Sequence, residues 1–209
     1  MEEAAFGGRY RTAKLLMERE AYRFDPLSPE NPLVFAVGPL AGTSFSNANR
    51  TSVGTRSPLT LGIKEANGGG TFGYALGQLG LSHLVLEGQA PEWTVLRLTR
   101  EGEVFFEPAE GLLGLGNYEA AKRLFSAYGQ KIAFALLGPV GEYGGLLSGI
   151  AFSDVDGRPS RLAARGGVGA VMASKRVKAI VVEVAGRPLV QDKPKATEAL
   201  RRSAALLRQ

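Results

Sequence analysis

A pattern that recurs after about 100 residues constrains the fold of this chain more than any other feature of its sequence. An apolar segment that ends in Gly-Pro and a short apolar tail occurs at 33–40 (LVFAVGPL) and recurs at 132–140 (IAFALLGPV). A glycine-rich segment followed by apolar residues occurs at 67–73 (NGGGTFG) and recurs at 165–169 (RGGVG). Two recurrences at nearly equal offset indicate two similar structural halves, although a glycine-rich chain can also produce such matches by chance.

Each half combines strands and helices. Helices are predicted over 10–21 and 118–128, the second with Asn117 as its N-cap. Short apolar runs predict strands at 33–37, 51–55, 83–88, 94–99, 103–107, 132–137, 148–152 and 177–184. The residues Ile63–Asn67 (IKEAN) are too polar for a buried strand. We therefore expect an α+β fold of two similar halves, each a mixed sheet with helices, related by a pseudo-twofold axis as an internal duplication.

The composition excludes several classes of site. The 209 residues contain no cysteine and one histidine. The chain can therefore form no disulfide, thiol nucleophile or zinc–thiolate site, and it cannot ligate an iron–sulfur cluster such as [4Fe–4S] through its own cysteines. A site of several histidines is excluded in the same way.

The charge balance favours anionic partners without choosing among them. The formal net charge is +5 and the isoelectric point is near 9.6. We expect a cytoplasmic protein that makes no membrane contact, because no apolar run approaches the roughly 20 residues of a membrane span and no signal-peptide pattern opens the sequence. A nucleic-acid-binding protein remains an alternative, disfavoured by the absence of interleaved aromatic and basic residues.

The two glycine-rich segments are candidate ligand sites. Glycines at a helix start let the backbone approach a phosphate, and arginines precede both segments in the chain. Arg50 and Arg56 bracket a predicted strand, while Arg158, Arg161 and Arg165 precede the second segment. Neither segment has the lysine of a Walker A loop or a sound dinucleotide fingerprint. Ordinary structural turns and solvated surface charges stay open as alternatives.

Longer motifs make the sequence recognisable. In chain order they are DPLSPENPLVFAVGPLAGTS, TRSPLT, NGGGTFGYALGQLG, LGPVGEYG and ARGGVGAVMASKRVKAIVVE. Between about Phe6 and Glu183 the chain resembles the N-terminal domain of the tungsten-containing aldehyde ferredoxin oxidoreductase family. The resemblance implies an α+β unit of two similar halves that holds a tungsten or molybdenum bis-pyranopterin cofactor, with a Mg²⁺ ion bridging the two pterin phosphates.

The resemblance also assigns residues to that cofactor. The implied cofactor-binding residues are Arg50, Asn67, Gly68, Gly69, Arg161, Leu162, Arg165 and Gly166. By the same resemblance Asn67 and Leu162 would hold the magnesium ion through their backbone carbonyls, a donor type that Mg²⁺ accepts. No catalytic residue is assigned. Glu65, Asp154 and Asp156 receive no acid–base role, and His83 is interpreted as structural.

Two parts of the family have no counterpart in these residues. They are the opening strand region ahead of Phe6-Gly7-Gly8-Arg9 and the C-terminal domains, which bring the cluster cysteines and the substrate channel. We therefore expect a pterin-binding domain at 1–186 and a basic C-terminal helix or tail at 187–209, with an amphipathic helix over 192–207. Aldehyde oxidation with ferredoxin as acceptor would need a cysteine-containing subunit or the missing domains.

Two interpretations remain beside this one. The chain could bind a pterin or another phosphorylated ligand by itself without turnover, or it could be the basic nucleic-acid-binding protein named above. A homo-oligomer is compatible with each of these interpretations. The sequence alone does not choose between them.

Overall fold

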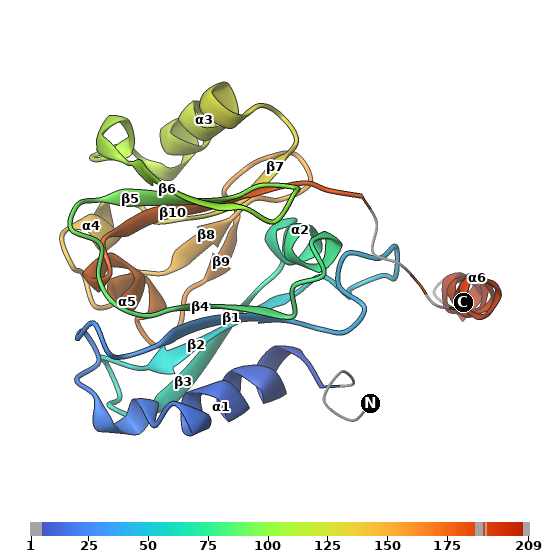
Figure 1. Cartoon of the computed structure of the whole chain (residues 1–209), viewed down its shortest axis with the longest axis horizontal. Coiled ribbons are helices and arrows are strands. Elements are labelled where there is room, and N and C mark those ends of the chain that lie inside the picture. Colours follow the sequence, from blue (N-terminus) through green and yellow to red (C-terminus); the bar gives the residue numbers. More distant parts are fainter. Residues whose placement is uncertain (1–5, 187–189, 191, 207–209) are drawn as a thin grey trace.

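Two β-sheets face each other with two short helices between them, and one further helix covers the outer face of each sheet (Figure 1). The computed structural model describes residues 6–186, 190 and 192–206. The first sheet contains β1 (Leu33–Val37), β2 (Thr51–Arg56), β3 (Ile63–Gly68) and β4 (His83–Leu86). The second contains β5 (Thr94–Leu98), β6 (Val104–Pro108), β7 (Ile132–Leu136), β8 (Ile150–Phe152), β9 (Arg161–Ala163) and β10 (Val177–Glu183).

The helices form the other layers. α1 (Gly8–Glu18) lies on the outer face of the first sheet and α3 (Asn117–Tyr128) on the outer face of the second (Figure 1). The short helices α2 (Phe72–Gln78) and α5 (Val168–Ser174) lie between the sheets. The remaining helical segments are η2 (Ala21–Arg23), η3 (Glu110–Leu112), α4 (Pro139–Glu142) and α6 (Lys193–Leu206). The expected mixed α+β fold with sheets and helices is confirmed.

The two sheets share an order of strands. The first runs β3-β2-β1-β4, and the second contains β9-β8-β7-β10 with the hairpin β5-β6 added beyond β10. Every pair in the shared part is antiparallel, whereas β5 pairs with β10 in parallel. In both sheets a glycine-rich loop and a seven-residue helix, α2 or α5, connect the third strand to the fourth.

Three apolar clusters correspond to the layers. The largest lies between the sheets and includes the stacked rings of Phe72 and Phe152, whose centroids are 5.2 Å apart. A second cluster packs α3 against the second sheet, and a third packs Leu16 of α1 against Val34 and Ala36 of β1. Because both faces of β1 and β7 are covered, all residues of these two strands are buried.

The structure corrects two local predictions. The polar segment IKEAN is β3, an edge strand paired with β2 over its whole length. Its polar residues are accommodated because Glu65 lies on the face covered by α1, where it accepts hydrogen bonds from Ser52 and Arg9. Asn117 is the first helical residue of α3 rather than its N-cap, which is Gly116.

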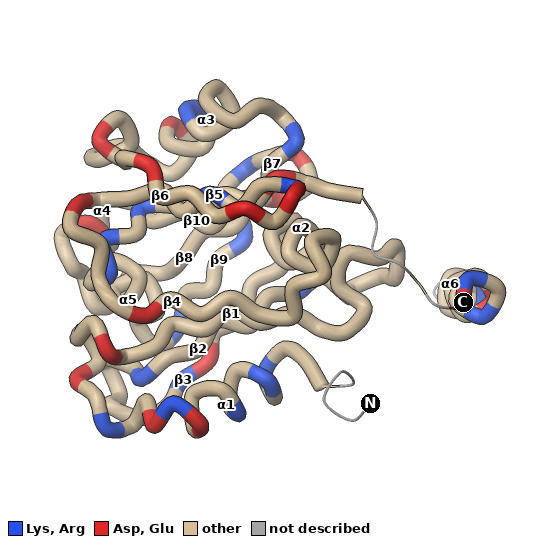
Figure 2. Tube along the Cα trace, in the orientation of Figure 1, with Lys and Arg blue, Asp and Glu red and all other residues tan. Residues whose placement is uncertain are grey.

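The C-terminal helix is confirmed over Lys193–Leu206, while Leu207 lies outside the described residues. α6 stands apart from the two sheets, and Lys and Arg are distributed around it (Figure 2). Across the part of the chain that the structure describes, none of the helices has the length and apolar character needed to span a bilayer.

Candidate functional site

The edge strands β3 and β9 meet side by side and join the two sheets into one seam. At one end a Cβ on Gly68 would lie 2.5 Å from the Phe152 ring and 3.5 Å from the Ala163 amide nitrogen. At the other end a Cβ on Gly166 would overlap the side chain of Lys64. The two strands therefore run in opposite directions along the seam. The glycine-rich loops lie at its two ends, separated by roughly 13 Å of strand.

The first loop, at 68–71, is bonded directly to the second half. The Thr71 amide donates to the Ser153 carbonyl at 2.7 Å, and the Thr71 hydroxyl lies 2.7 Å from the Ser153 hydroxyl. The Ser153 hydroxyl in turn accepts from the Phe134 amide of β7 at 3.0 Å. Gly70 has φ +99° and faces the Ser153 carbonyl so closely that a Cβ would overlap it.

The second loop, at 165–167, makes a matching contact with the first half. Gly166 and Gly167 both adopt left-handed backbone conformations, with φ of +72° and +71°. A Cβ on Gly167 would lie 2.6 Å from the Leu146 carbonyl and 2.8 Å from the Pro58 ring. Gly68, Gly70, Gly166 and Gly167 thus face groups across the seam that leave no room for a side chain, and the last three also have left-handed backbone conformations; Gly69 has only Arg50, at 3.9 Å.

These contacts change the interpretation of the glycine-rich segments. α2 and α5 have seven residues each, and the Thr71 amide at the start of α2 is already bonded within the protein. Neither helix start is a phosphate site by itself. The candidate site is instead the surface of the seam, where side chains and loop backbone from both halves come together.

Arg50 and Asn67 form the polar group at the first end of the seam. The Arg50 guanidinium donates from Nε to the Asn67 side-chain oxygen and from a terminal nitrogen to its carbonyl at 3.5 Å. The side-chain nitrogen Nδ2 of Asn67 donates to the Glu65 carboxylate at 3.3 Å, and this bond directs the side-chain oxygen of Asn67 toward Arg50. A Cβ on Gly69 would lie 3.9 Å from Arg50, so three of the predicted site residues are brought together here.

The second half contributes residues beside this group. Gly70 lies next to Arg161, whose Cγ would be 3.3 Å from a Cβ on the glycine. Leu162 is 53% exposed, although it lies in a strand of the second sheet. Its neighbours Ala163 and Arg161 face Gly68 and Gly70, so the backbone of Leu162 lies opposite Gly69 of the first loop. Arg165 is exposed beside Gly166, at the other end of the seam.

Other residues that the sequence singled out lie elsewhere. Arg56 is at the far end of β2, where its guanidinium binds the carbonyls of Phe24 and Leu61. Arg158 is 3.5 Å from Asp156 at the surface. Neither arginine belongs to the polar group around Arg50.

The remaining titratable residues organise local structure. The Ser160 hydroxyl hydrogen bond, together with donation from backbone amides, lowers the pKa of Asp154 below its usual value. Burial, together with Arg11 and Arg19, lowers the pKa of His83. Over residues 6–186, 190 and 192–206, no cluster of three or more His, Cys, Asp and Glu side chains could hold a metal ion.

Comparison with known protein families identifies the family of this chain. Residues 1–184 match the family model described as "Aldehyde ferredoxin oxidoreductase, N-terminal domain". The chain belongs to this family. The resemblance inferred from the sequence motifs is therefore confirmed.

Individual relatives agree with the assignment. The chain is similar to tungsten-containing aldehyde ferredoxin oxidoreductases of Pyrococcus abyssi (42% identity over 86% of the chain) and Pyrococcus furiosus (38% over 90%). It spans about 30% of the length of these relatives. Its fold is similar to a chain in "Active site complex BamBC of Benzoyl Coenzyme A reductase in complex with 1,5 Dienoyl-CoA". That match has a TM-score of 0.87 and 30% identity, and it covers 95% of this chain and 30% of the other.

The residues present fit a phosphate-bearing cofactor with a bound cation. The seam offers arginine forks for phosphate at Arg50 and Arg161, and backbone carbonyls at Asn67 and Leu162 are hard oxygen donors.

Sequence reasoning missed Ser153 and Lys64, which contact the first and the second loop, respectively, from the opposite half. They are separated from their loops by 82 residues, from Ser153 to Thr71, and by about 100 residues, from Lys64 to Gly166. Lys64 lies on β3, the third strand of the first half, whereas Ser153 follows β8, the second strand of the second half, so the approximate repeat alone does not place both residues.

Proposed function

We propose that this chain is a bis-pyranopterin-binding domain of an aldehyde ferredoxin oxidoreductase-like enzyme. The observation that carries the proposal is the seam, which places two glycine-rich loops, each with adjacent arginines, at opposite ends of one surface. A ligand with two similar phosphate-bearing halves would meet one loop with each half. Membership of the family and the identity of about 40% to tungsten-containing relatives support this choice of ligand.

Each predicted residue has a distinct task in the proposal. Arg50 would bind phosphate or pterin oxygens through its planar fork, oriented by Asn67. Gly68 and Gly69 would allow close approach of the ligand to the loop backbone. Arg161, which lies beside the first loop, would bind the same half of the ligand as Arg50, and Arg165 and Gly166 at the other end of the seam would bind the other half. The carbonyls of Asn67 and Leu162 would hold Mg²⁺ between the phosphates.

The chain's own role is positioning. When bound, the tungsten or molybdenum centre would supply the two-electron redox chemistry that oxidises an aldehyde. The protein residues of the seam would fix the cofactor against the two sheets and neutralise its phosphate charge. Because the 209 residues contain no cysteine, a [4Fe–4S] cluster that passes electrons to ferredoxin would be held by polypeptide outside them.

The shared order of strands supports an internal duplication. Residues 33–86 and 132–183 would be the two copies, related by a pseudo-twofold axis through the seam. The domain would extend over 1–186, followed by the basic segment 187–209. Superposition of the two copies tests this, since duplication predicts that β1-β2-β3-α2-β4 superimposes on β7-β8-β9-α5-β10 in one rotation.

The function is tested by what the purified protein carries. The chain is produced in cells grown with tungstate and molybdate, alone and together with the C-terminal 70% of a tungsten-containing relative. Metal content is measured by elemental analysis, and pterin by its fluorescence after oxidative release. We expect tungsten or molybdenum together with pterin in the complemented form.

A matched pair of variants makes the test specific to the seam. Arg50→Ala should reduce both metal and pterin several-fold, whereas Arg123→Ala removes an exposed charge from α3 and should leave them unchanged. Pterin without metal and without turnover would favour a non-catalytic binder. Absence of both in every form, with the protein folded, would contradict the proposal.

A further inference from the structure

Glu65 is a largely buried carboxylate that has no role in the proposed cofactor site. Its side chain is 16% exposed, and it lies in β3 on the face covered by α1. Because side chains alternate along a strand, Asn67 lies on the same face as Glu65. The register of β2 and β3 places Ser52 directly opposite Asn67. The carboxylate is therefore next to the residue that contacts Arg50.

Three side chains donate hydrogen bonds to this carboxylate. Its Oε1 accepts from the Ser52 hydroxyl at 2.8 Å and from Asn67 Nδ2 at 3.3 Å. Its Oε2 accepts from Arg9 Nε at 3.2 Å. Since the Ser52 hydroxyl has one proton and gives it to the carboxylate, it accepts from the Thr12 hydroxyl at 3.0 Å. A polar network thus runs from α1 through β2 and β3 to the edge of the seam.

The carboxylate determines which way the Asn67 amide points. An ionised carboxylate only accepts hydrogen bonds, whereas a side-chain amide has a donor nitrogen and an acceptor oxygen. Asn67 therefore presents its nitrogen to Glu65 and its oxygen to Arg50, which donates to it from Nε. In the reversed amide, oxygen would face the carboxylate and nitrogen would face the guanidinium. Both contacts would then be repulsive.

Asn67 in turn determines which part of the guanidinium remains available. Arg50 donates to Asn67 from Nε and, at 3.5 Å, from Nη2. The other terminal nitrogen, Nη1, would lie 3.9 Å from a Cβ on Gly69. Nη1 therefore faces the first loop. A phosphate at this loop would meet the terminal nitrogens of the planar fork rather than Nε.

We infer that Glu65 is a positioning residue of the seam. It acts through Asn67 and holds the exposed Arg50 side chain in one orientation, in which the terminal nitrogens receive a phosphate group. Without this restraint, a long and flexible side chain would lose its freedom only on binding, which weakens affinity. The inference rests on the proposed function for the ligand, but the orientation of Arg50 is measurable without one.

Two variants separate orientation from charge. Glu65→Gln keeps an acceptor oxygen for Ser52 and Asn67 and removes the negative charge. Glu65→Leu removes both the acceptor and the charge. If Glu65 acts by orientation, only the leucine variant weakens phosphate binding. If it acts only by its charge, both variants strengthen the binding of an anion to the same degree.

The orientation of Arg50 is measured by NMR on the whole chain with ¹⁵N-labelled arginine side chains. The Arg50 Nε–H signal is assigned by its absence in Arg50→Lys. Because this proton is donated to Asn67, it should exchange slowly with solvent in the unmodified protein. Glu65→Leu should accelerate its exchange about tenfold, and Glu65→Gln by less than about twofold.

Inorganic pyrophosphate, titrated at low salt, is the probe for phosphate binding. Glu65→Leu should weaken its binding between about two- and tenfold, which corresponds to ordering one long side chain. Glu65→Gln should bind it equally or slightly more tightly. Glu65→Asp keeps the charge but withdraws it by one methylene, so it should change both measurements in the same direction as Glu65→Leu. It keeps the test available if the leucine variant does not fold.

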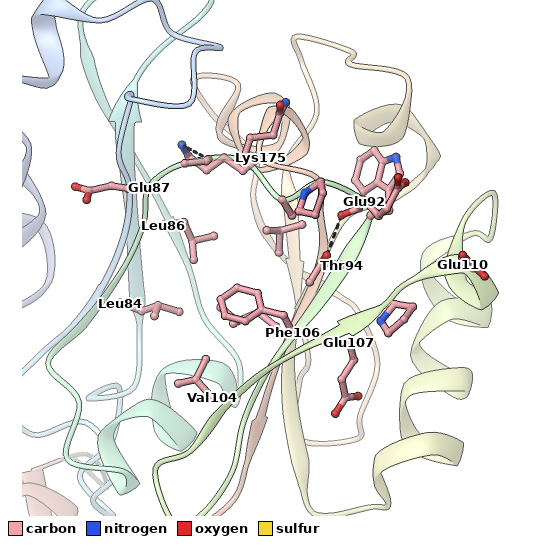
Figure 3. Close-up of a pocket in the computed structure, with 18 of the residues that line it drawn as sticks. Leu84, Leu86, Glu87, Glu92, Thr94, Val104, Phe106, Glu107, Glu110 and Lys175 are labelled. Atoms are coloured by element: carbon pink, nitrogen blue, oxygen red, sulfur yellow. Dashed lines mark hydrogen bonds between the residues drawn. The ribbon is translucent and has the colours of Figure 1, made fainter.

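The control removes a carboxylate from a distant part of the molecule. Glu110 is exposed and lines the groove between β4 and β6 (Figure 3). These two strands are at the opposite edges of their sheets from the strands of the seam. Glu110→Leu makes the same change in net charge as Glu65→Leu and should alter neither measurement. Thermal unfolding shows that each variant is folded.

Two results would overturn the inference. One is unchanged exchange of the Arg50 Nε–H in folded Glu65→Leu and Glu65→Asp. The other is equal acceleration in Glu65→Gln and Glu65→Leu, which would make the charge rather than the acceptor oxygen the cause. Faster exchange in Glu65→Leu alone, with no pyrophosphate bound by any form, would support the positioning role and count against the proposed function of Arg50.

Discussion

Gly70 of the first loop and Gly166 of the second face groups of the opposite half that differ in how freely they can move. Gly70 faces the backbone carbonyl of Ser153, which is held in place by β8 and by the bond to Thr71. Gly166 faces the side chain of Lys64, which can move aside. The same residue type at corresponding places in the two halves is thus required to different degrees. Gly70 therefore has less room for a side chain than Gly166, although Gly167 in the second loop also faces a backbone carbonyl and the Pro58 ring.

The largest effect is expected at Gly70. Gly70→Ala combines a left-handed backbone conformation with overlap of a fixed carbonyl, so the free energy of unfolding should fall by about 3 to 5 kcal/mol. Gly80→Ala is the matched control, because Gly80 has φ +73° and open space around it. It should cost about 1 kcal/mol. Denaturant unfolding measures both, and equal losses would show that backbone conformation alone explains the glycine.

Ser153→Ala tests the bond between the halves at the first loop. The substitution removes a hydroxyl that contacts Thr71 and accepts from the Phe134 amide. Leaving that buried amide without its partner should cost about 2 kcal/mol. Thr71→Ser keeps the hydroxyl on the other side and should change the unfolding free energy by less than about 1 kcal/mol. If both variants cost the same, the seam is not held by this bond.

Gly166→Ala should have a smaller effect than Gly70→Ala. Its backbone conformation costs about 1 to 2 kcal/mol, and displacement of the Lys64 side chain adds little. In a Lys64→Ala background the loss should fall toward the backbone cost alone. A loss as large as that of Gly70→Ala, unchanged by Lys64→Ala, would contradict the proposed difference between the loops.

Arg50 should affect stability least and ligand retention most. The residue is exposed, so Arg50→Ala should change the unfolding free energy by less than about 0.5 kcal/mol. Arg50→Lys should restore cofactor retention incompletely, because an ammonium group lacks the planar fork of guanidinium. Thermal unfolding and elemental analysis of the same samples separate the two effects. A parallel loss of both would indicate a structural role for Arg50.

The sequence predicted most strands to within one residue, whether the strand is buried throughout, like β1, or largely exposed, like β6. β1, β7 and β10 are apolar on both faces because layers cover both sides, and their runs were recognised to within one residue. β3 was missed because its polar Glu65 is compensated by Ser52, 13 residues away, and by Arg9 of α1, 56 residues away. Local polarity does not reveal a partner more than 50 residues distant.

The candidate site was predicted less completely than the fold. The family resemblance brought Arg50, Asn67 and Gly69 together, and the structure places them in contact. The interpretation of the loops as helix-start phosphate sites did not anticipate that the Thr71 amide binds Ser153. The loop sequence shows where the glycines are. Most of the atoms that leave no room for a side chain at these glycines belong to distant parts of the chain.

The number of pterins bound per metal atom tests the central claim most directly. The claim is that two loops at the ends of one seam hold the two halves of one cofactor. Metal and released pterin are therefore quantified on the same sample of the complemented protein, with and without Arg165→Ala at the second loop. We predict two pterins per tungsten or molybdenum, with both contents reduced by the variant. A single pterin per metal, or a content that Arg165→Ala leaves unchanged while Arg50→Ala lowers it, would contradict the account.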